Sequence, residues 1–216
     1  MQSGPKEPGY VDWHVRAPNN ALLGNGYTRA EALLTHSFAL GLTIFALTYW
    51  WSIDSSPKLW QAALIAVAAY DLLGGVVANN LNSCKRFYHA AEVPGASAFL
   101  RATRYPLLFT ALHFHTVIFA FAFGYPPSTG IVWYIVLWTS VAVVTRTPLY
   151  LRRPLAAGIT VAAILLGQTV LRLPQGLGWV IASLFLKLVV GHSVQEEPYR
   201  PRPLETIEPA SEGSSK

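Results

Sequence analysis

The sequence predicts an all-α, polytopic membrane protein built as a bundle of about six transmembrane helices. Of its 216 residues, 52% are hydrophobic and only 12% are charged, whereas soluble globular chains carry about 25% charged residues. The mean hydropathy is +0.35. Several apolar runs approach the roughly twenty residues that a helix needs to cross the hydrocarbon core of a bilayer. These three observations exclude an ordinary soluble domain.

Six apolar stretches account for the predicted helices, and prolines lie near many of their ends, where helices tolerate them. The stretches cover residues 31–51, 59–79, 105–124, 131–149, 155–172 and 177–193. A polar N-terminal segment, residues 1–30, precedes this transmembrane domain of residues 31–193. The tail, residues 194–216, is rich in proline, glutamate and serine, a composition typical of disordered segments.

The basic residues predict that both termini lie in the cytoplasm. Lysine and arginine concentrate in the N-terminal segment, after the second and fourth stretches and in the tail, while the opposite side has only Lys58 and Arg172. Cytoplasmic loops carry such an excess of basic residues. Cys84, the only thiol, should then face the cytoplasm. The net charge of +5 therefore reflects topology, and the expected partner is the lipid bilayer and not nucleic acid.

Asp71 is the most informative residue, because it interrupts the apolar stretch WQAALIAVAAYDLLGGVVAN. A charged group at that depth costs about 2.5–3.5 kcal/mol on insertion scales. His113 in the third stretch falls at a similar depth, since a helix rises 1.5 Å per residue. We therefore predict that Asp71 and His113 face each other as the catalytic pair. The alternative is a structural ion pair between Asp71 and Lys187.

A stripe of polar and small residues runs from Asp71 toward the predicted cytoplasmic end at helical spacing, and a basic connection follows it. We expect this region to bind the polar head of a substrate, while Gly74 and Gly75 serve helix packing. Contact between the run KRFYH and anionic lipids is the alternative. The predicted substrate-binding residues are Asn79, Asn82, Lys85, Arg86, Tyr88, His89 and Lys187.

Two histidines, His113 and His115, are separated by one residue. On a regular helix their side chains point about 200° apart, so we expect only His113 to reach the site. Imidazole and carboxylate together suit zinc or iron. The candidate metal ligands are His36, His113, His192 and Asp71, and the sequence does not determine whether a metal or a haem is bound.

These features favour a membrane-embedded enzyme that acts on a hydrophobic or lipid-like substrate by acid/base or metal-assisted chemistry, at a polar site open to the cytoplasmic side. A proton-coupled carrier, a haem-binding redox protein and a structural or assembly protein without a small-molecule site are the alternatives. The sequence contains neither a P-loop nor an HExxH motif, which would point to phosphate or zinc chemistry.

Overall fold

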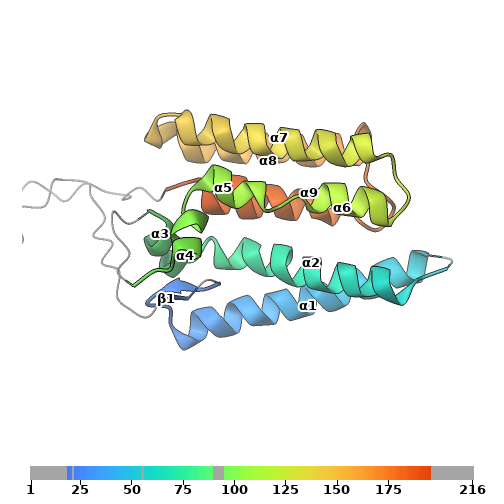
Figure 1. The fold of residues 1–216 in the computed structure, drawn as a ribbon, viewed down its shortest axis with the longest axis horizontal. Helices are drawn as coiled ribbons and strands as arrows, with labels where there is room; N and C mark the ends of the chain where they lie inside the picture. The colour runs from blue at the N-terminus through green and yellow to red at the C-terminus, as the bar shows by residue number, and fades with distance from the viewer. Residues whose placement is uncertain (1–18, 21, 55, 90–94, 196–216) are drawn as a thin grey trace, which may run out of the picture. The chain divides into compact units, whose positions relative to one another are not determined.

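The computed structural model describes residues 19–20, 22–54, 56–89 and 95–195, and these residues are mainly helical (Figure 1). The predicted disordered tail lies outside the described residues from position 196 onward, and most of the polar N-terminal segment also lies outside them. The described part of the chain belongs to one compact unit. The helical class predicted from the sequence is therefore confirmed.

Four of the described helices are long and apolar enough to cross a membrane. They correspond to the first, second, fourth and fifth predicted stretches. The four are α1 (Arg29–Ile53), α2 (Leu59–Ala78), α7 (Pro127–Arg146) and α8 (Leu149–Thr169). Helices α1 and α2 pack against each other, as do α7 and α8 (Figure 1). This arrangement fits a multi-pass membrane protein.

The third predicted stretch is not one continuous helix. It forms α5 (Pro106–Ala111) and α6 (His115–Ala122). Leu112 ends α5, and the backbone of Phe114, with φ −84° and ψ 28°, leaves the helical conformation. The prediction of an unbroken helix over residues 105–124 is therefore wrong, and the interruption carries two histidines into positions that a regular helix forbids.

The sixth predicted stretch is also short and changes its winding. It begins as α9 (Trp179–Leu184) and continues as a π-helix, η1 (Phe185–His192). This segment packs against α2, α7 and α8, so it lies at the centre of the bundle (Figure 1). The buried core around it includes Leu72, Trp133 and Leu188. A charged side chain from η1 is therefore surrounded by apolar helices.

Two short strands and two short helices form one end of the bundle. They are β1 (Asn19–Asn20), β2 (Gly24–Asn25), α3 (Asn82–His89) and α4 (Ala98–Thr103). The strands pair antiparallel, a small departure from the all-α expectation. Gly24 has φ +75°, and a Cβ at this position would lie 2.3 Å from the Ser83 carbonyl oxygen. Only glycine permits the hairpin to pack this closely on α3.

Cys84 cannot report the topology of the chain, although it is the only thiol. Its side chain is fully buried in α3, and Sγ donates a hydrogen bond to the Leu22 carbonyl at 3.3 Å. Burial raises the pKa of the Cys84 thiol to about 12. Because the thiolate is the nucleophile, maleimide should label the folded protein slowly at pH 7.5 and quickly after unfolding in SDS. Rapid labelling of the folded protein in detergent would contradict this burial.

Orientation in the membrane is better tested with new thiols at exposed sites. In a Cys84→Ser background, Asn82→Cys places a thiol at the start of α3, and Ser128→Cys places one at the start of α7; both positions are exposed. If both termini are cytoplasmic, an impermeant maleimide added to intact cells should label only the Ser128→Cys protein. Labelling of only the Asn82→Cys protein would reverse the orientation.

Candidate functional site

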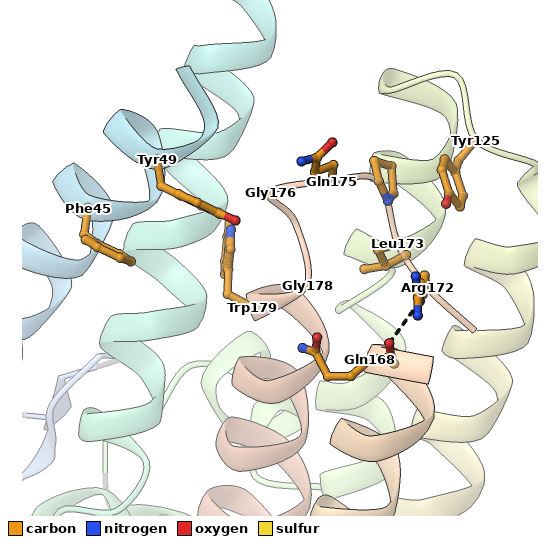
Figure 2. Close-up of a pocket in the computed structure, with 12 residues that line it drawn as sticks. Phe45, Tyr49, Tyr125, Gln168, Arg172, Leu173, Gln175, Gly176, Gly178 and Trp179 are labelled. Atoms are coloured by element: carbon orange, nitrogen blue, oxygen red, sulfur yellow. Dashed lines mark hydrogen bonds between the residues drawn. The ribbon is translucent and has the colours of Figure 1, made fainter. Parts of the chain in front are cut away.

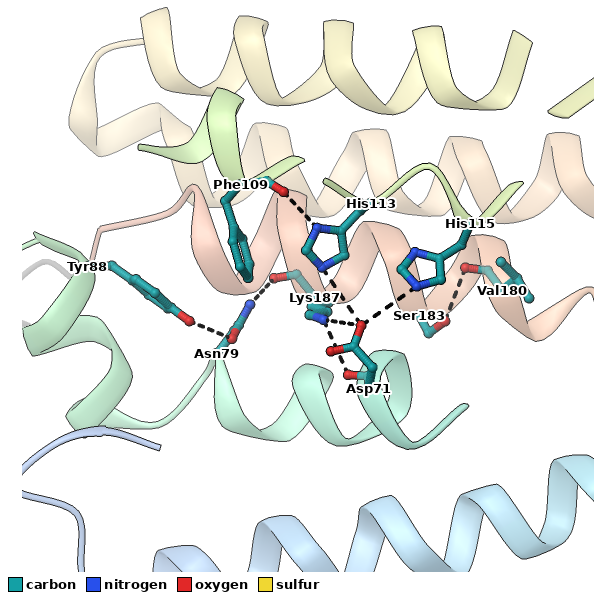
Figure 3. A network of polar contacts seen from close by, with 9 residues as sticks. All are labelled: Asp71, Asn79, Tyr88, Phe109, His113, His115, Val180, Ser183 and Lys187. Carbon is teal, nitrogen blue, oxygen red and sulfur yellow. Dashed lines mark hydrogen bonds and ion pairs between the residues drawn. The ribbon is translucent and has the colours of Figure 1, made fainter. Parts of the chain in front are cut away.

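The carboxylate of Asp71 lies at the centre of a polar cluster inside the bundle (Figure 3). Lys187 Nζ, from η1, lies 2.8 Å from Asp71 Oδ2. His113 Nε2 and His115 Nε2 each lie 3.9 Å from the same oxygen. The predicted proximity of Asp71 and His113 is therefore confirmed. The ion pair that the sequence suggested between Asp71 and Lys187 is also present.

Both histidines reach the carboxylate because the helix that would separate them is interrupted. His113 lies in the break, and His115 is the first residue of α6. Their rings lie 5.6 Å apart. The expectation that only His113 reaches the site assumed a regular helix and is wrong. Residues 110–116 contain neither glycine nor proline, so no helix-breaking residue marked the interruption.

A hydrogen bond of His113 determines which of its two ring nitrogens carries the proton and which has a free lone pair. His113 Nδ1 lies 2.7 Å from the Phe109 carbonyl oxygen, which can only accept a hydrogen bond. Nδ1 therefore carries a proton, and Nε2 of the neutral ring is free to accept one. His115 Nδ1 is buried and has no hydrogen-bond partner in the described part of the chain. The two imidazoles thus each place Nε2 near the same carboxylate oxygen.

Lys187 is held in place by its ion pair and by a glycine. Its side chain is buried, and Nζ also donates to the Asp71 main-chain carbonyl at 3.3 Å. A Cβ at position 75 would lie 2.5 Å from Lys187 Cε, so Gly75 leaves room for the lysine stem. A Cβ at position 74 would lie 2.7 Å from the Ala39 Cβ of α1. Both glycines therefore have the packing role that the sequence predicted.

A chain of polar contacts connects the cluster with α3 (Figure 3). Tyr88 donates its hydroxyl to Asn79 Oδ1 at 3.1 Å. Asn79 Nδ2 in turn donates to the Lys187 main-chain carbonyl, also at 3.1 Å. Three residues that the sequence assigned to substrate binding are therefore close together. Lys187 adopts its position in a π-helical turn, a geometry that often accompanies functional sites.

Two other predicted substrate-binding residues direct their donors to the main chain. Lys85 is buried, and its Nζ donates to the carbonyls of Gly191 within η1 and of Val194 after it. Arg86 donates to the Asn25 carbonyl at 3.1 Å and thereby fixes β2 against α3. Both side chains therefore have a structural role, and the expectation that they bind a substrate head group stays a prediction. Asn82 is exposed, and His89 lies at the end of α3.

The four candidate metal ligands do not converge. His36 Nδ1 lies 2.7 Å from the Tyr70 hydroxyl on another face of α2. His192 Nε2 donates to the Thr103 carbonyl at 2.9 Å. Among the described residues, no group of three histidine, cysteine, aspartate or glutamate side chains is arranged to hold a metal ion. The Lys187 ammonium also contacts Asp71 Oδ2, where its charge would repel a divalent cation.

The cluster is open on the side of Asp71. The Asp71 side chain is 44% exposed, compared with 4% for Lys187 and 6% for His113. Asp71 lines an apolar depression of about 500 Å³ together with Thr43, Val67 and other residues of α1, α2 and the hairpin.

The described residues thus combine four helices that are long and apolar enough to cross a membrane with a cluster of one carboxylate, one ammonium and two imidazoles. Comparisons with protein-family models, curated proteins and solved structures found no match to this chain. The functional argument therefore depends on the geometry of the site.

The glycine beneath Lys187 gives a direct test of the cluster. Gly75→Ala adds a methyl group where the lysine stem lies, so Lys187 must move away from Asp71. Overpacking of this kind costs about 1–3 kcal/mol, and the unfolding temperature should fall. Gly158→Ala is the matched control, because a Cβ there meets no atom within 4 Å. Equal unfolding temperatures for both variants, measured in detergent, would contradict the close contact.

His89 should make stability depend on pH. Burial, and then the positive charges of Lys85, Arg152 and Arg104, lower its pKa to about 4 from the ordinary 6.5. Below pH 6.5 the unfolded chain therefore binds a proton that the folded chain cannot bind, and folding stability falls until about pH 4. Between pH 6.5 and 4, the unfolding temperature of the His89→Gln variant should fall less than that of the wild type. If the unfolding temperatures of the two proteins fell equally with pH, the lowered pKa of His89 would be contradicted.

Proposed function

We propose that this protein is a membrane-embedded enzyme that acts on a hydrophobic or lipid-like substrate by acid/base chemistry. One observation carries the proposal: an ammonium and two imidazoles surround a single carboxylate oxygen in the middle of an apolar helix. Ionisable residues inside membrane segments mark functional sites by default. Acid/base chemistry is favoured over metal assistance because Lys187 already contacts the oxygen that a metal would need.

The contacts suggest a division of roles within the cluster. The Lys187 ammonium balances the charge of Asp71 and fixes Oδ2, while no hydrogen bond is recorded for Oδ1 in the described part of the chain. His113 accepts a proton at Nε2, because its Nδ1 proton is bound to the Phe109 carbonyl. His115 lies within reach of the same oxygen and can return a proton. Such paired groups are what general acid/base catalysis requires.

The open side of Asp71 supports a substrate that arrives from the bilayer. The adjoining depression is apolar and shallow, so it suits a hydrocarbon chain more than a water-soluble molecule. The reacting polar group of the substrate would then meet Asp71 and the imidazoles while its chain remains in lipid. Burial of Lys187 and His113 limits the access of water to the reacting atoms.

We also propose six membrane crossings with both termini in the cytoplasm. Residues 106–122 and 179–192 are apolar but shorter than a typical membrane-spanning helix. The proposal that both segments cross the membrane is supported by their position beside α2 (Figure 1). It is also supported by the basic residues that flank the predicted cytoplasmic ends. The thiol-labelling experiment above tests this orientation.

A proton-coupled carrier is the second candidate, favoured by the polar path from Tyr88 through Asn79 to Lys187. Proteoliposomes with a trapped pH dye distinguish the two. The enzyme predicts that a total lipid extract changes in composition on incubation with the protein, as measured by mass spectrometry, without protein-dependent proton flux. Proton flux together with unchanged lipids would support the carrier and contradict the enzyme.

Substitution of Asp71 separates a working group from a structural ion pair. Asp71→Asn keeps the volume and removes the charge, so the lipid conversion should fall at least tenfold while the unfolding temperature changes little. If the pair with Lys187 is structural, the same change leaves a buried ammonium without its partner, at a cost of about 3–5 kcal/mol in soluble proteins.

The double variant Asp71→Asn, Lys187→Met completes the test. A structural pair predicts that it recovers both the unfolding temperature and the activity of the wild type, because no charge remains buried. That recovery would mean that Asp71 is scaffolding. Continued loss of lipid conversion in a stable double variant supports the catalytic assignment.

A further inference from the structure

A second cavity lies away from the Asp71 cluster, near the connection between α8 and α9 (Figure 2). Its volume is about 760 Å³. Side chains from α1, the end of α8 and the start of α9 line it, and none of them belongs to the cluster. The cavity therefore requires an explanation that is independent of the proposed chemistry.

Arg172 gives this cavity a positive charge. Its Nε donates to the Gln168 main-chain carbonyl at 2.9 Å, which satisfies an acceptor near the C-terminal end of α8 (Figure 2). The cavity lining contains no acidic side chain, and no carboxylate within the described ranges pairs with Arg172. A guanidinium has five N–H donors, so most of its donors are free to bind an anion. The contact with the backbone uses only one nitrogen of Arg172.

Trp179 adds a hydrogen-bond donor to the same cavity. Its Nε1 is buried and has no acceptor in the described part of the chain. A buried donor without a partner is unfavourable by about 1–3 kcal/mol, and a ligand oxygen would relieve this. Tyr49 and Tyr125 place aromatic rings around the opening (Figure 2). The cavity thus combines a cation, an unused N–H group and aromatic walls.

The apolar part of the lining continues onto the surface of α1. Phe45 is 66% exposed and stacks on Tyr49 with ring centroids 6.2 Å apart. An alkyl chain can follow these rings out of the cavity along a helix that is long enough to cross the membrane. Aromatic residues at such helix ends sit at the level of lipid head groups.

We propose that this cavity binds the phosphate head group of an anionic lipid. The phosphate would accept hydrogen bonds from Arg172 on one side of the cavity, and a glycerol or ester oxygen of the same lipid would accept one from Trp179 Nε1 on the other side (Figure 2), while one acyl chain lies against Phe45. Arginine binds phosphate through paired, charge-assisted hydrogen bonds. The exposed aromatic path favours a lipid over free phosphate, because free phosphate makes no use of the apolar wall. The site does not depend on the chemistry at Asp71.

Lipid binding to the purified full-length chain tests the proposal, with native mass spectrometry as the readout. Phosphatidylglycerol should bind to the wild type, and Arg172→Gln should weaken this binding about tenfold, as the loss of a charge-assisted contact predicts. Arg146→Gln is the matched control. Arg146 also bonds a carbonyl four residues earlier, that of Ala142 at 3.3 Å, but it does not line the cavity. Its substitution should leave binding unchanged.

Two further measurements decide the nature of the ligand. Trp179→Phe keeps an aromatic ring and removes the N–H group, so it should weaken phosphatidylglycerol binding about threefold without lowering the unfolding temperature of the lipid-free protein. Phosphatidylcholine should bind more weakly than phosphatidylglycerol to the wild type. Inorganic phosphate should displace the lipid only at much higher concentration.

Three results would overturn the proposal. Equal losses of phosphatidylglycerol binding in Arg172→Gln and Arg146→Gln would mean that only the total positive charge matters, and not the cavity. Unchanged phosphatidylglycerol binding in both Arg172→Gln and Trp179→Phe would show that the cavity does not bind the lipid. Tight, Arg172-dependent binding of inorganic phosphate in the absence of lipid would identify a soluble anion as the ligand.

Discussion

The ion pair between Asp71 and Lys187 is the constraint on which the centre of this protein depends. Two opposite charges lie 2.8 Å apart among apolar helices, with the Lys187 side chain buried and the Asp71 side chain 44% exposed. The surroundings accommodate the pair: Gly75 leaves space for the lysine stem, and Asn79 bonds the Lys187 carbonyl. The position of η1 against α2 therefore follows from electrostatics as well as from apolar packing.

The interruption of the third apolar segment adds two imidazoles to that ion pair. A pair alone is a sufficient scaffold, but two imidazoles at 3.9 Å from the same oxygen add ring nitrogens that can accept or donate a proton. Asp71 is the most exposed member at 44%, His115 is 20% exposed, and Lys187 and His113 are buried. This geometry supports the proposals of a proton-transfer centre and of a hydrophobic substrate.

The two ends of the bundle use their basic residues differently. At the α3 end, Lys85 and Arg86 donate to main-chain carbonyls and hold η1 and β2 in place. Near the α8–α9 connection, Arg172 uses only Nε for the backbone and directs its other donors to a cavity. Basic residues that look alike in sequence as topology signals therefore differ in whether they remain available for a ligand.

The sequence alone predicted the helical class, the four long apolar helices and the proximity of Asp71 and His113, because hydropathy and helical periodicity are local properties. It did not determine the break before His115, since no glycine or proline marks it, nor the burial of Cys84 and Lys85, which depends on the hairpin and η1 packing around α3. Only the tertiary structure decided these features, because segments far apart in the chain supply the carbonyls, charges and space that fix them.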